Sequence, residues 1–347
     1  MIPERASQVL NYIVKRYIAD AKPVPSQEIA RFANLGVSPA TIRNDMAYLE
    51  REGFLLRPHV SSGGIPSDKA YRHYVETLNT TDIPSEERRL IAHTFHQVER
   101  EVEAWVSLSA TMLARITHNV AVVSMPKSAD CRLKHFELIA IYGPRALAVA
   151  VLEGARVKQQ IINFSEDMTQ DALAVISARL NNEFDGMITS EIEACQLELS
   201  PLEQQARDIL LELMKSEDSQ EYEEPYLEGW HFILNQPEFT ESAHMSRLVE
   251  LVEQRGLLKV IMPARLGYHG VHVIIGKENK NEAIQNCSVV ITRYGLPDTA
   301  SGTIAVVGPT RMPYNVTIPT VYYLSTILGQ LIAGLYGREY RTNMETA

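Results

Sequence analysis

Cysteine is scarce in this sequence, and the motifs of common enzyme classes are missing from it. The three cysteines, Cys131, Cys195 and Cys287, are far apart, odd in number and in no CxxC pair. This pattern argues against a disulfide framework and fits a reducing compartment. No GxSxG, GxxxxGKS/T or GxGxxG motif is present, so the chain offers no nucleophile elbow, phosphate loop or dinucleotide fingerprint. We therefore expect a protein without enzymatic activity and without a cofactor.

Long hydrophobic runs are also lacking. The best candidate, Leu138 to Leu152, is interrupted by Gly143, Pro144 and Arg145, whereas a membrane-spanning helix needs about eighteen or more apolar residues. Residues 1–17 have helical periodicity and several charges rather than the compact apolar region of a signal peptide. We expect a cytoplasmic protein without a membrane partner.

The charge is acidic overall but unevenly distributed. The 347 residues carry a net charge of −10, and a chain of this length accommodates about two or three domains. Residues 1–78 hold ten Lys/Arg and eight Asp/Glu, a net charge of +2, which leaves −12 for the remaining 269 residues. Affinity for phosphate depends on local cations, so the N-terminal segment remains a candidate for DNA binding.

The N-terminal segment has the order of elements of a winged helix-turn-helix. Helical spacing covers residues 4–18, and Ser26 is expected to cap a short second helix with Ile29, Phe32 and Ala33 facing inward. A third helix follows, then a short strand at residues 54–56, a flexible tip at 61–64, a return at 65–66 and a helix over 68–78.

The third helix has the features of a recognition helix. Ser38 is its expected cap, Pro39 suits its first position, and Gly53 ends it. With Ile42, Met46 and Leu49 facing inward, polar side chains remain on the outer side, where arginine reads guanine and asparagine reads adenine in a major groove. The predicted DNA-contacting residues of this helix, of the wing and of the next helix are Ser38, Thr41, Arg43, Asn44, Tyr48, Arg51, Arg57, His59, Ser61, Ser62, Lys69 and Arg72.

The rest of the chain indicates an α/β domain with an insertion. Apolar steps of three and four predict one long helix over residues 85–117, packed on its own domain or forming a coiled-coil seam. Strand-like and helical runs then alternate, with strands at both ends and helices in the middle. The expected strands are 120–125, 136–142, 146–151, 157–164, 271–275, 287–294 and 302–307, the expected helices are 170–183, 201–217, 243–255 and 320–334, and 217–225 is expected to be a loop.

Three motifs carry a resemblance to a known family. ATIRNDMAYLE and PHVSSGGIPSDKAYRHYV lie in tandem near the N-terminus, and TIAVVGPTRMPY lies near the other end. Together they resemble the HrcA family of heat-inducible transcription repressors. The resemblance covers most of the chain and is strongest in residues 1–78 and 286–335.

The resemblance implies an α+β multidomain fold. A winged helix-turn-helix (residues 1–78) would be followed by a GAF-like α/β domain (85–128 and 256–347), with a dimerisation domain inserted at 129–255. It also implies a homodimer that represses chaperone operons through an inverted-repeat operator, CIRCE, is released by heat, and is modulated by the GroE chaperonin. This chain has Ser62, Gly63 and Gly64 where the family usually has Ala-Gly-Arg, so the usual wing arginine is absent.

Other interpretations remain open at this stage. The GAF-like region would bind a metabolite in a ligand-sensing regulator, and a winged helix can also serve only to bind protein. The pairs His93/His96 and His269/His272 have metal-ligand spacing but no companion ligands, so no metal site is expected. The stretch 308–311 fits a turn better than an anion site.

Overall fold

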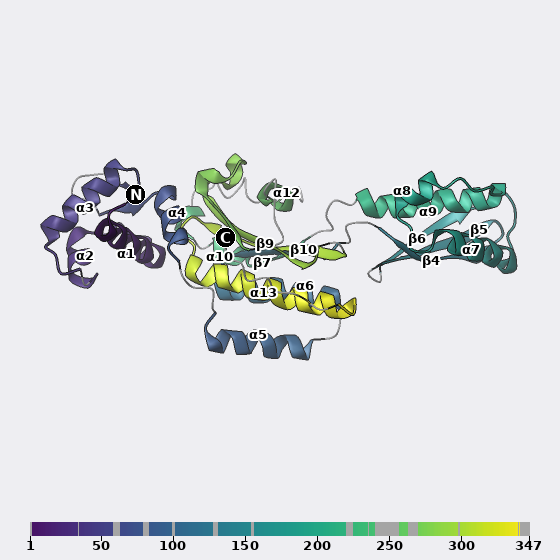
Figure 1. Cartoon of the computed structure of the whole chain (residues 1–347), viewed down its shortest axis with the longest axis horizontal. Helices are drawn as coiled ribbons and strands as arrows, with labels where there is room; N and C mark the ends of the chain where they lie inside the picture. Colours follow the sequence, from purple (N-terminus) through teal and green to yellow (C-terminus); the bar gives the residue numbers. More distant parts are fainter. Residues whose placement is uncertain are drawn as a thin grey trace.

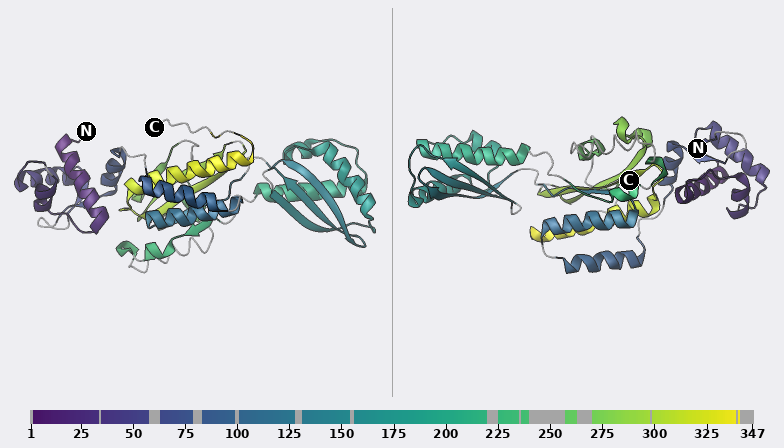
Figure 2. Two further views of the ribbon diagram at one scale, coloured as in Figure 1. Left: turned by 90° about the horizontal axis from the view of Figure 1, so that it is seen from below. Right: turned by 180° about the vertical axis from the view of Figure 1, so that it is seen from behind.

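The computed structural model is elongated and has three parts in a line (Figure 1). The winged helix (residues 2–78) lies at one end, a five-stranded sheet with its helices forms the central part, and a three-stranded sheet with its own helices forms the distal part (residues 131–219). Two further views show the same order (Figure 2). The structure describes residues 2–33, 35–57, 63–78, 83–98, 101–127, 131–153, 156–219, 225–234, 236–239, 257–262, 270–297, 299–338 and 340.

The first part contains the elements predicted for a winged helix-turn-helix. Three helices precede a two-stranded antiparallel sheet and a fourth follows it: α1 (Glu4–Asp20), α2 (Ser26–Phe32), α3 (Pro39–Arg51), β1 (Leu55–Leu56), β2 (Ile65–Pro66) and α4 (Asp68–Glu76). Ile42, Met46 and Leu49 of α3 are buried against α1 and α2, as their spacing predicts. Burial of each such side chain stabilises the fold by roughly 1.5–3 kcal/mol. This small core therefore fixes the orientation of α3.

Helix α2 differs from the prediction at two positions. Its cap is Pro25, so Ser26 is the first helical residue rather than the cap. Phe32 was expected to face inward, but this prediction is wrong, because its side chain is 58% exposed. A helix of seven residues buries only Ile29, and the Phe32 ring lies instead 5.1 Å from the guanidinium carbon of Arg31.

The central part is built on an antiparallel five-stranded sheet of order β7-β3-β10-β9-β8. β10 pairs with both β3 and β9 and lies in the middle. The strands are β3 (Val120–Val123), β7 (Tyr226–Glu228), β8 (His272–Ile275), β9 (Cys287–Leu296) and β10 (Ala300–Pro309).

Both faces of this sheet are buried, so its central strands are apolar without alternation. Val123 and Val290 face one core, and their neighbours Val122 and Val289 face the other. The first face carries α6 (Val102–Thr117) and α13 (Tyr314–Leu335), with α5 (Ser85–Gln97) outside them (Figure 2). The second face carries short elements, namely α10 (Trp230–Leu234), η1 (Pro237–Phe239), α12 (Leu257–Ile261) and η3 (Glu282–Ile284), while η2 (Gly276–Glu278) follows β8.

Helix α13 is long and apolar enough to cross a membrane by length and composition alone. In the structure it packs along β9 and α6, and 56% of its most apolar window is buried inside the protein. The helix therefore has the placement of a core helix.

The prediction of a single long helix over residues 85–117 is wrong. The chain forms two helices, because Val98 and Glu101 adopt extended backbone conformations between them. Folding back brings Ile91 of α5 into the same core as Trp105 of α6. One straight helix of this length cannot present both apolar faces to one core, so the intramolecular alternative holds and the coiled-coil seam does not.

The distal part is a separate α+β unit with its own core. Its strands lie where the sequence predicts strands over 136–142, 146–151 and 157–164, and they form an antiparallel meander: β4 (Leu133–Tyr142), β5 (Arg145–Leu152) and β6 (Arg156–Asn163). Helices α7 (Gln170–Phe184) and α9 (Pro201–Ser219) cover one sheet face, and α8 (Thr189–Ala194) packs on α9. Because α9 continues to Ser219, the loop prediction is wrong for residues 217–219.

The return from the distal part joins the central sheet. β7 pairs with β3, so residues 226–228 lie with the central sheet, although the predicted insertion extends to residue 255. The predicted helix over 243–255 lies outside the described residues. The domain boundaries stay a prediction.

Cys287 at the start of β9 provides a test of this core by pH. Its burial raises the thiol pKa from 9.0 to about 12. Because the folded-state pKa is the higher one, this contribution to stability is complete below pH 9 and is lost as the pH rises towards 12. Across this window the free energy of unfolding should fall less steeply in Cys287→Ala than in the wild type, by roughly 1.4 kcal/mol for each pH unit. Urea unfolding at several pH values measures this, and an unchanged slope contradicts it; Cys195→Ala, at a half-buried site, is the control.

Candidate nucleic-acid interface

Helix α3 begins and ends at the residues that the sequence indicates. The Ser38 hydroxyl accepts a hydrogen bond from the Thr41 amide at 3.2 Å, and Pro39 is the first helical residue. Gly53, just beyond the end, has a φ of +78°, a left-handed conformation that favours glycine. These two ends fix the length of the helix that is offered to a ligand.

The exposed face of α3 is a stripe that contains two residues missed by the sequence analysis. Ala40 and Ala47 are exposed together with Arg43, Asn44 and Arg51. These positions lie opposite the buried face of Ile42, Met46 and Leu49, as the helical period of the sequence predicts. Small methyl groups beside arginine and asparagine suit close approach to base edges and thymine methyls.

Two predicted contact residues on α3 are only partly accessible. Thr41 is half-buried, and its hydroxyl lies 3.1 Å from that of Ser38. Tyr48 is half-buried as well, with the Arg51 guanidinium carbon 5.6 Å from its ring. Both lie on the flank of the stripe rather than at its centre, so their role as contacts stays a prediction.

Both carboxylates of α3 are neutralised by arginines from elsewhere in the winged helix. Arg5 of α1 makes two hydrogen bonds to Asp45, at 2.8 and 3.0 Å. Arg57 donates from Nε to Glu50 at 2.8 Å and is only 11% exposed. The pairs reduce the repulsion that α3 would exert on phosphate. They also place the Arg57 guanidinium against protein, which leaves it poorly exposed for the DNA contact predicted for it.

The wing is described only at its base. His59, Ser61 and Ser62, predicted to contact DNA, lie outside the described residues. Gly63 approaches the chain's own backbone: a Cβ there would lie 2.6 Å from backbone atoms of Pro23 and Val24. The sequence predicts a flexible tip over residues 61–64, and the structure shows that Gly63 is needed for this contact within the chain.

Gly64 also faces the protein interior. It pairs with Val24 in an isolated bridge, and a Cβ at this position would point at Met46 and Leu55, 3.1 and 3.3 Å away. A side chain here would therefore start towards the core. An arginine at position 64 would thus have its Cβ pointing away from solvent.

Lys69 and Arg72 of α4 are both held by other parts of the chain. Lys69 donates to the Glu52 carbonyl at 2.9 Å, at the end of α3, and its amine lies 4.2 Å from the centre of the Phe54 ring. Arg72 bonds Glu278 and the Val273 carbonyl in the central part. Arg72 was predicted to contact DNA, but in this arrangement it connects the winged helix to the central part.

The described residues contain no group of three or more His, Cys, Asp or Glu side chains that could hold a metal ion. His93 and His96 are exposed on α5. His269 lies outside the described residues.

A capped helix with an exposed Arg/Asn/Ala face, held over a small core and followed by a two-stranded wing, defines a DNA-binding transcription regulator of the helix-turn-helix class. Residues 17–69 match the model of the DeoR-like helix-turn-helix domain. Residues 103–318 match that of the HrcA protein C-terminal domain. The chain belongs to the HrcA family of heat-inducible transcription repressors, and it is a regulator rather than an enzyme.

Relatives support this membership over nearly the whole chain. The heat-inducible transcription repressor HrcA of Dehalococcoides mccartyi is 42% identical over 338 residues, with 97% of this chain and 98% of the relative covered. The same-named proteins of Desulforudis audaxviator and Roseiflexus castenholzii are 38% and 34% identical, covering 96% and 99% of this chain and 99% and 98% of theirs. A crystal structure described as a hypothetical protein at 2.2 Å resolution has a similar fold, with a TM-score of 0.60, 24% identity, and 96% and 98% of the two chains covered.

Proposed function

We propose that this repressor binds an inverted-repeat operator of the CIRCE type as a homodimer, in the cytoplasm, and controls chaperone operons. Heat releases it, and the GroE chaperonin modulates its activity, as the family resemblance implies. The observation that carries DNA binding is the exposed stripe of α3, in which Arg43, Asn44 and Arg51 alternate with alanines above a rigid core. Selecting duplexes from a random pool with the purified protein tests this directly, because the selected sequences report half-site, spacing and symmetry together.

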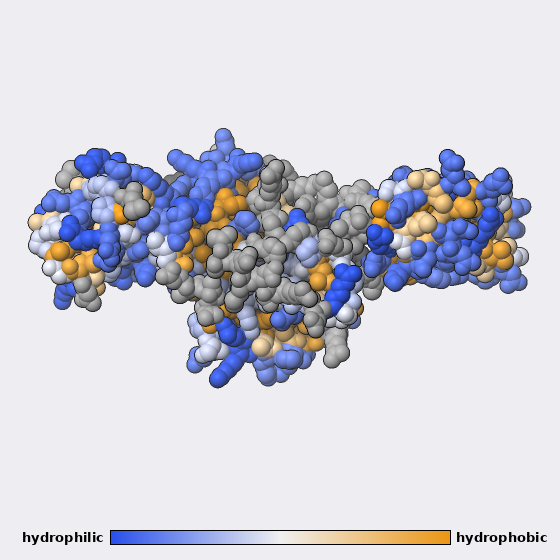
Figure 3. All heavy atoms as spheres, viewed as in Figure 1, coloured by the Kyte–Doolittle hydropathy of each residue, from blue (hydrophilic) through white to orange (hydrophobic). Residues whose placement is uncertain are grey.

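The exposed face of the three-stranded sheet supports dimerisation through the distal part. α7 and α9 cover only one face. The other face carries Ile139, Leu147 and Ile161 as directly opposed neighbours on β4, β5 and β6, and Ile139 and Ile161 are 43% and 65% exposed. Apolar and hydrophilic residues are interspersed on the surface of the distal part that Figure 3 presents. An apolar sheet face of this kind is typical of an interface between subunits.

Dimerisation matches the symmetry of the proposed operator. A two-fold dimer presents two recognition helices, and an inverted repeat presents two half-sites related by the same symmetry. Half-sites on one side of the duplex lie roughly 34 Å apart or at multiples of that distance. The body of the protein would hold the two winged helices at this separation.

The proposed heat response is tested by melting the protein while operator binding is followed. Both tryptophans, Trp105 and Trp230, lie in the central part, so tryptophan fluorescence, excited without the tyrosines, reports this part alone. We expect operator binding to be lost within the fluorescence transition and before the winged helix unfolds. Binding at two half-sites needs one fixed geometry, and the regions of lowest local stability open first. Operator binding that persists well above this transition contradicts the proposal.

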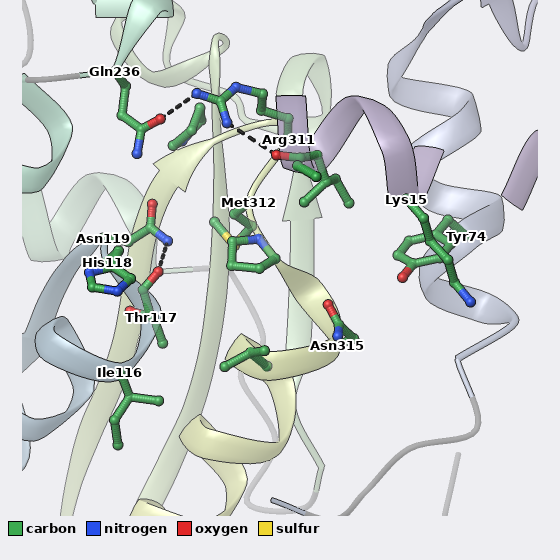
Figure 4. A pocket seen from close by; sticks show the side chains of 15 residues that line it. Lys15, Tyr74, Ile116, Thr117, His118, Asn119, Gln236, Arg311, Met312 and Asn315 are labelled. Atoms are coloured by element: carbon green, nitrogen blue, oxygen red, sulfur yellow. Dashed lines mark hydrogen bonds between the residues drawn. The ribbon is translucent and has the colours of Figure 1, made fainter. Parts of the chain in front are cut away.

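A cleft supports a second candidate, a ligand-sensing regulator. A cavity of about 640 Å³ lies between the winged helix and the central part (Figure 4), a size and place typical of small-molecule sites. Heating the purified protein without any small molecule separates the two candidates, because a metabolite sensor has no reason to release DNA specifically. A protein-binding scaffold, the third class, predicts no salt-dependent retention on duplex DNA.

A further inference from the structure

The winged helix is joined to the central part by directional polar contacts from α4. Asp68 and Arg72 lie one helical turn apart on α4. The Asp68 carboxylate accepts a hydrogen bond from the Lys277 amide at 3.0 Å. Arg72 donates to Glu278 at 2.9 Å and to the Val273 carbonyl at 2.6 Å, and a second nitrogen bonds the same Glu278 carboxylate. The guanidinium therefore bridges β8 and the η2 turn that follows it.

The central part is built to receive these two side chains. Gly276 has a φ of +53°, and a Cβ there would lie 2.3 Å from an Asp68 oxygen, so only glycine allows this approach. Glu278 also accepts from the Ile275 amide at 2.8 Å, which orients its carboxylate towards Arg72. An arginine–carboxylate pair bonded through two nitrogens fixes angle as well as distance. Arg72 and Glu278 are only 30% and 39% exposed, so solvent screens the pair incompletely.

A second contact lies on the other side of the junction. Arg311, in the turn between β10 and α13, donates to the Ile18 carbonyl in the last turn of α1 at 3.3 Å. The same guanidinium bonds Gln236 (Figure 4) and also Glu238, and these two side chains hold it in place. This is the arginine of the TIAVVGPTRMPY motif, so the turn expected there has a function in joining the two parts.

Between the two polar contacts the junction is partly hollow. The buried rings of Tyr71 and Tyr314, 6.1 Å apart, form an apolar contact. The cleft described above opens beside them, lined by Lys15 and Tyr74 from the winged helix and by residues of the central part such as Asn315 (Figure 4). Interfaces between domains that are small and polar allow relative motion unless specific contacts prevent it.

We propose that Arg72 and Glu278 are positioning residues that set the orientation of the winged helix on the body. This inference rests on the proposed function, because orientation matters only if two winged helices must reach two half-sites at once. α3 lies on the side of the winged helix that faces away from the central part (Figure 1), so a small rotation at the junction displaces the recognition helix along the duplex. The pair thereby selects the half-site spacing that a dimer accepts, without touching DNA.

The test uses the full chain and three sets of duplexes based on the operator selected from the random pool. These are a single half-site, the complete inverted repeat, and inverted repeats with lengthened or shortened spacers. For Arg72→Ala we expect half-site affinity within about two-fold of the wild type, while the preference for the selected spacer over the altered ones falls at least ten-fold. Glu278→Ala should behave in the same way, and the double variant should be no worse than either single one, because all three remove the same interaction.

A phosphate contact by Arg72 predicts a different pattern and would overturn the inference. Arg72→Ala would then weaken half-site and full-site binding equally and reduce the salt dependence, whereas Glu278→Ala would free the arginine and strengthen both. Arg16→Ala, which removes an ion pair with Glu28 inside the winged helix, is the matched control and should keep the spacing preference. Unchanged spacing preference in Arg72→Ala also contradicts the inference. A wild-type protein without salt-dependent or spacing-dependent binding would overturn the proposed function first.

Discussion

Replacing Ile161 with lysine is expected to convert the dimer to a monomer and to lower the affinity for an inverted-repeat operator by roughly 10²–10⁴-fold. Ile161 is 65% exposed on the apolar sheet face and lies opposite Leu147. In the proposed dimer its side chain is covered by the partner, so a lysine there places an unpaired charge in an apolar interface. Half-site affinity should stay unchanged, since the winged helix lies at the other end of the molecule (Figure 1).

The matched control is Val175→Lys. Val175 is also β-branched and 68% exposed, but it lies on α7, which covers the opposite face of the sheet. This variant should remain a dimer with full operator affinity. Analytical ultracentrifugation gives the oligomeric state, and titration of half-site and full-site duplexes gives the two affinities. A dimeric Ile161→Lys variant with wild-type binding would show that the apolar sheet face is not the interface.

Alanine at Arg43 or Asn44 should abolish the preference for one base at one position of each half-site. Both side chains are exposed on the central stripe of α3, and a bidentate contact to guanine or adenine contributes about 1–3 kcal/mol of discrimination. In a two-fold dimer the loss occurs in both half-sites, so affinity for the complete operator falls by roughly the square of the single-site effect. Titration against operators with each base substituted in turn identifies the position that becomes indifferent.

Lys69→Ala is the comparison for these variants. We expect it to weaken all sequences about equally and to lower the salt slope, as a phosphate contact does. Lys69 also donates to the Glu52 carbonyl. The thermal unfolding of the Lys69→Ala variant must therefore be measured together with its DNA binding. The proposed division between base reading and phosphate binding is wrong if Arg43→Ala and Lys69→Ala reduce binding equally on every duplex.

The winged helix was predictable because its signals are local. Ser38, Pro39 and Gly53 mark the ends of α3 through hydrogen bonds and dihedral angles within a few residues. The spacing of Ile42, Met46 and Leu49 then fixes the outer face, including Ala40 and Ala47. The meander of β4, β5 and β6 was predictable for the same reason, since short turns join strands that pair with their sequence neighbours.

Other features depended on contacts between distant residues. The break between α5 and α6 has no glycine or proline to mark it, and it exists because folding back buries Ile91 beside α6. Phe32 matches the helical period of α2 yet lies outside, because so short a helix has only one side chain in the core.

The amino-acid sequence alone determined the recognition helix, the small core beneath it and the family, since each depends on residues close together along the chain. Only the tertiary structure decided the use of the charged side chains. Arg57 and Arg72 have the same chemistry as Arg43, but they face Glu50 and Glu278, and Arg72 and Glu278 are separated by 206 positions. A guanidinium binds the nearest available carboxylate or phosphate, and which one is near is a property of the folded chain.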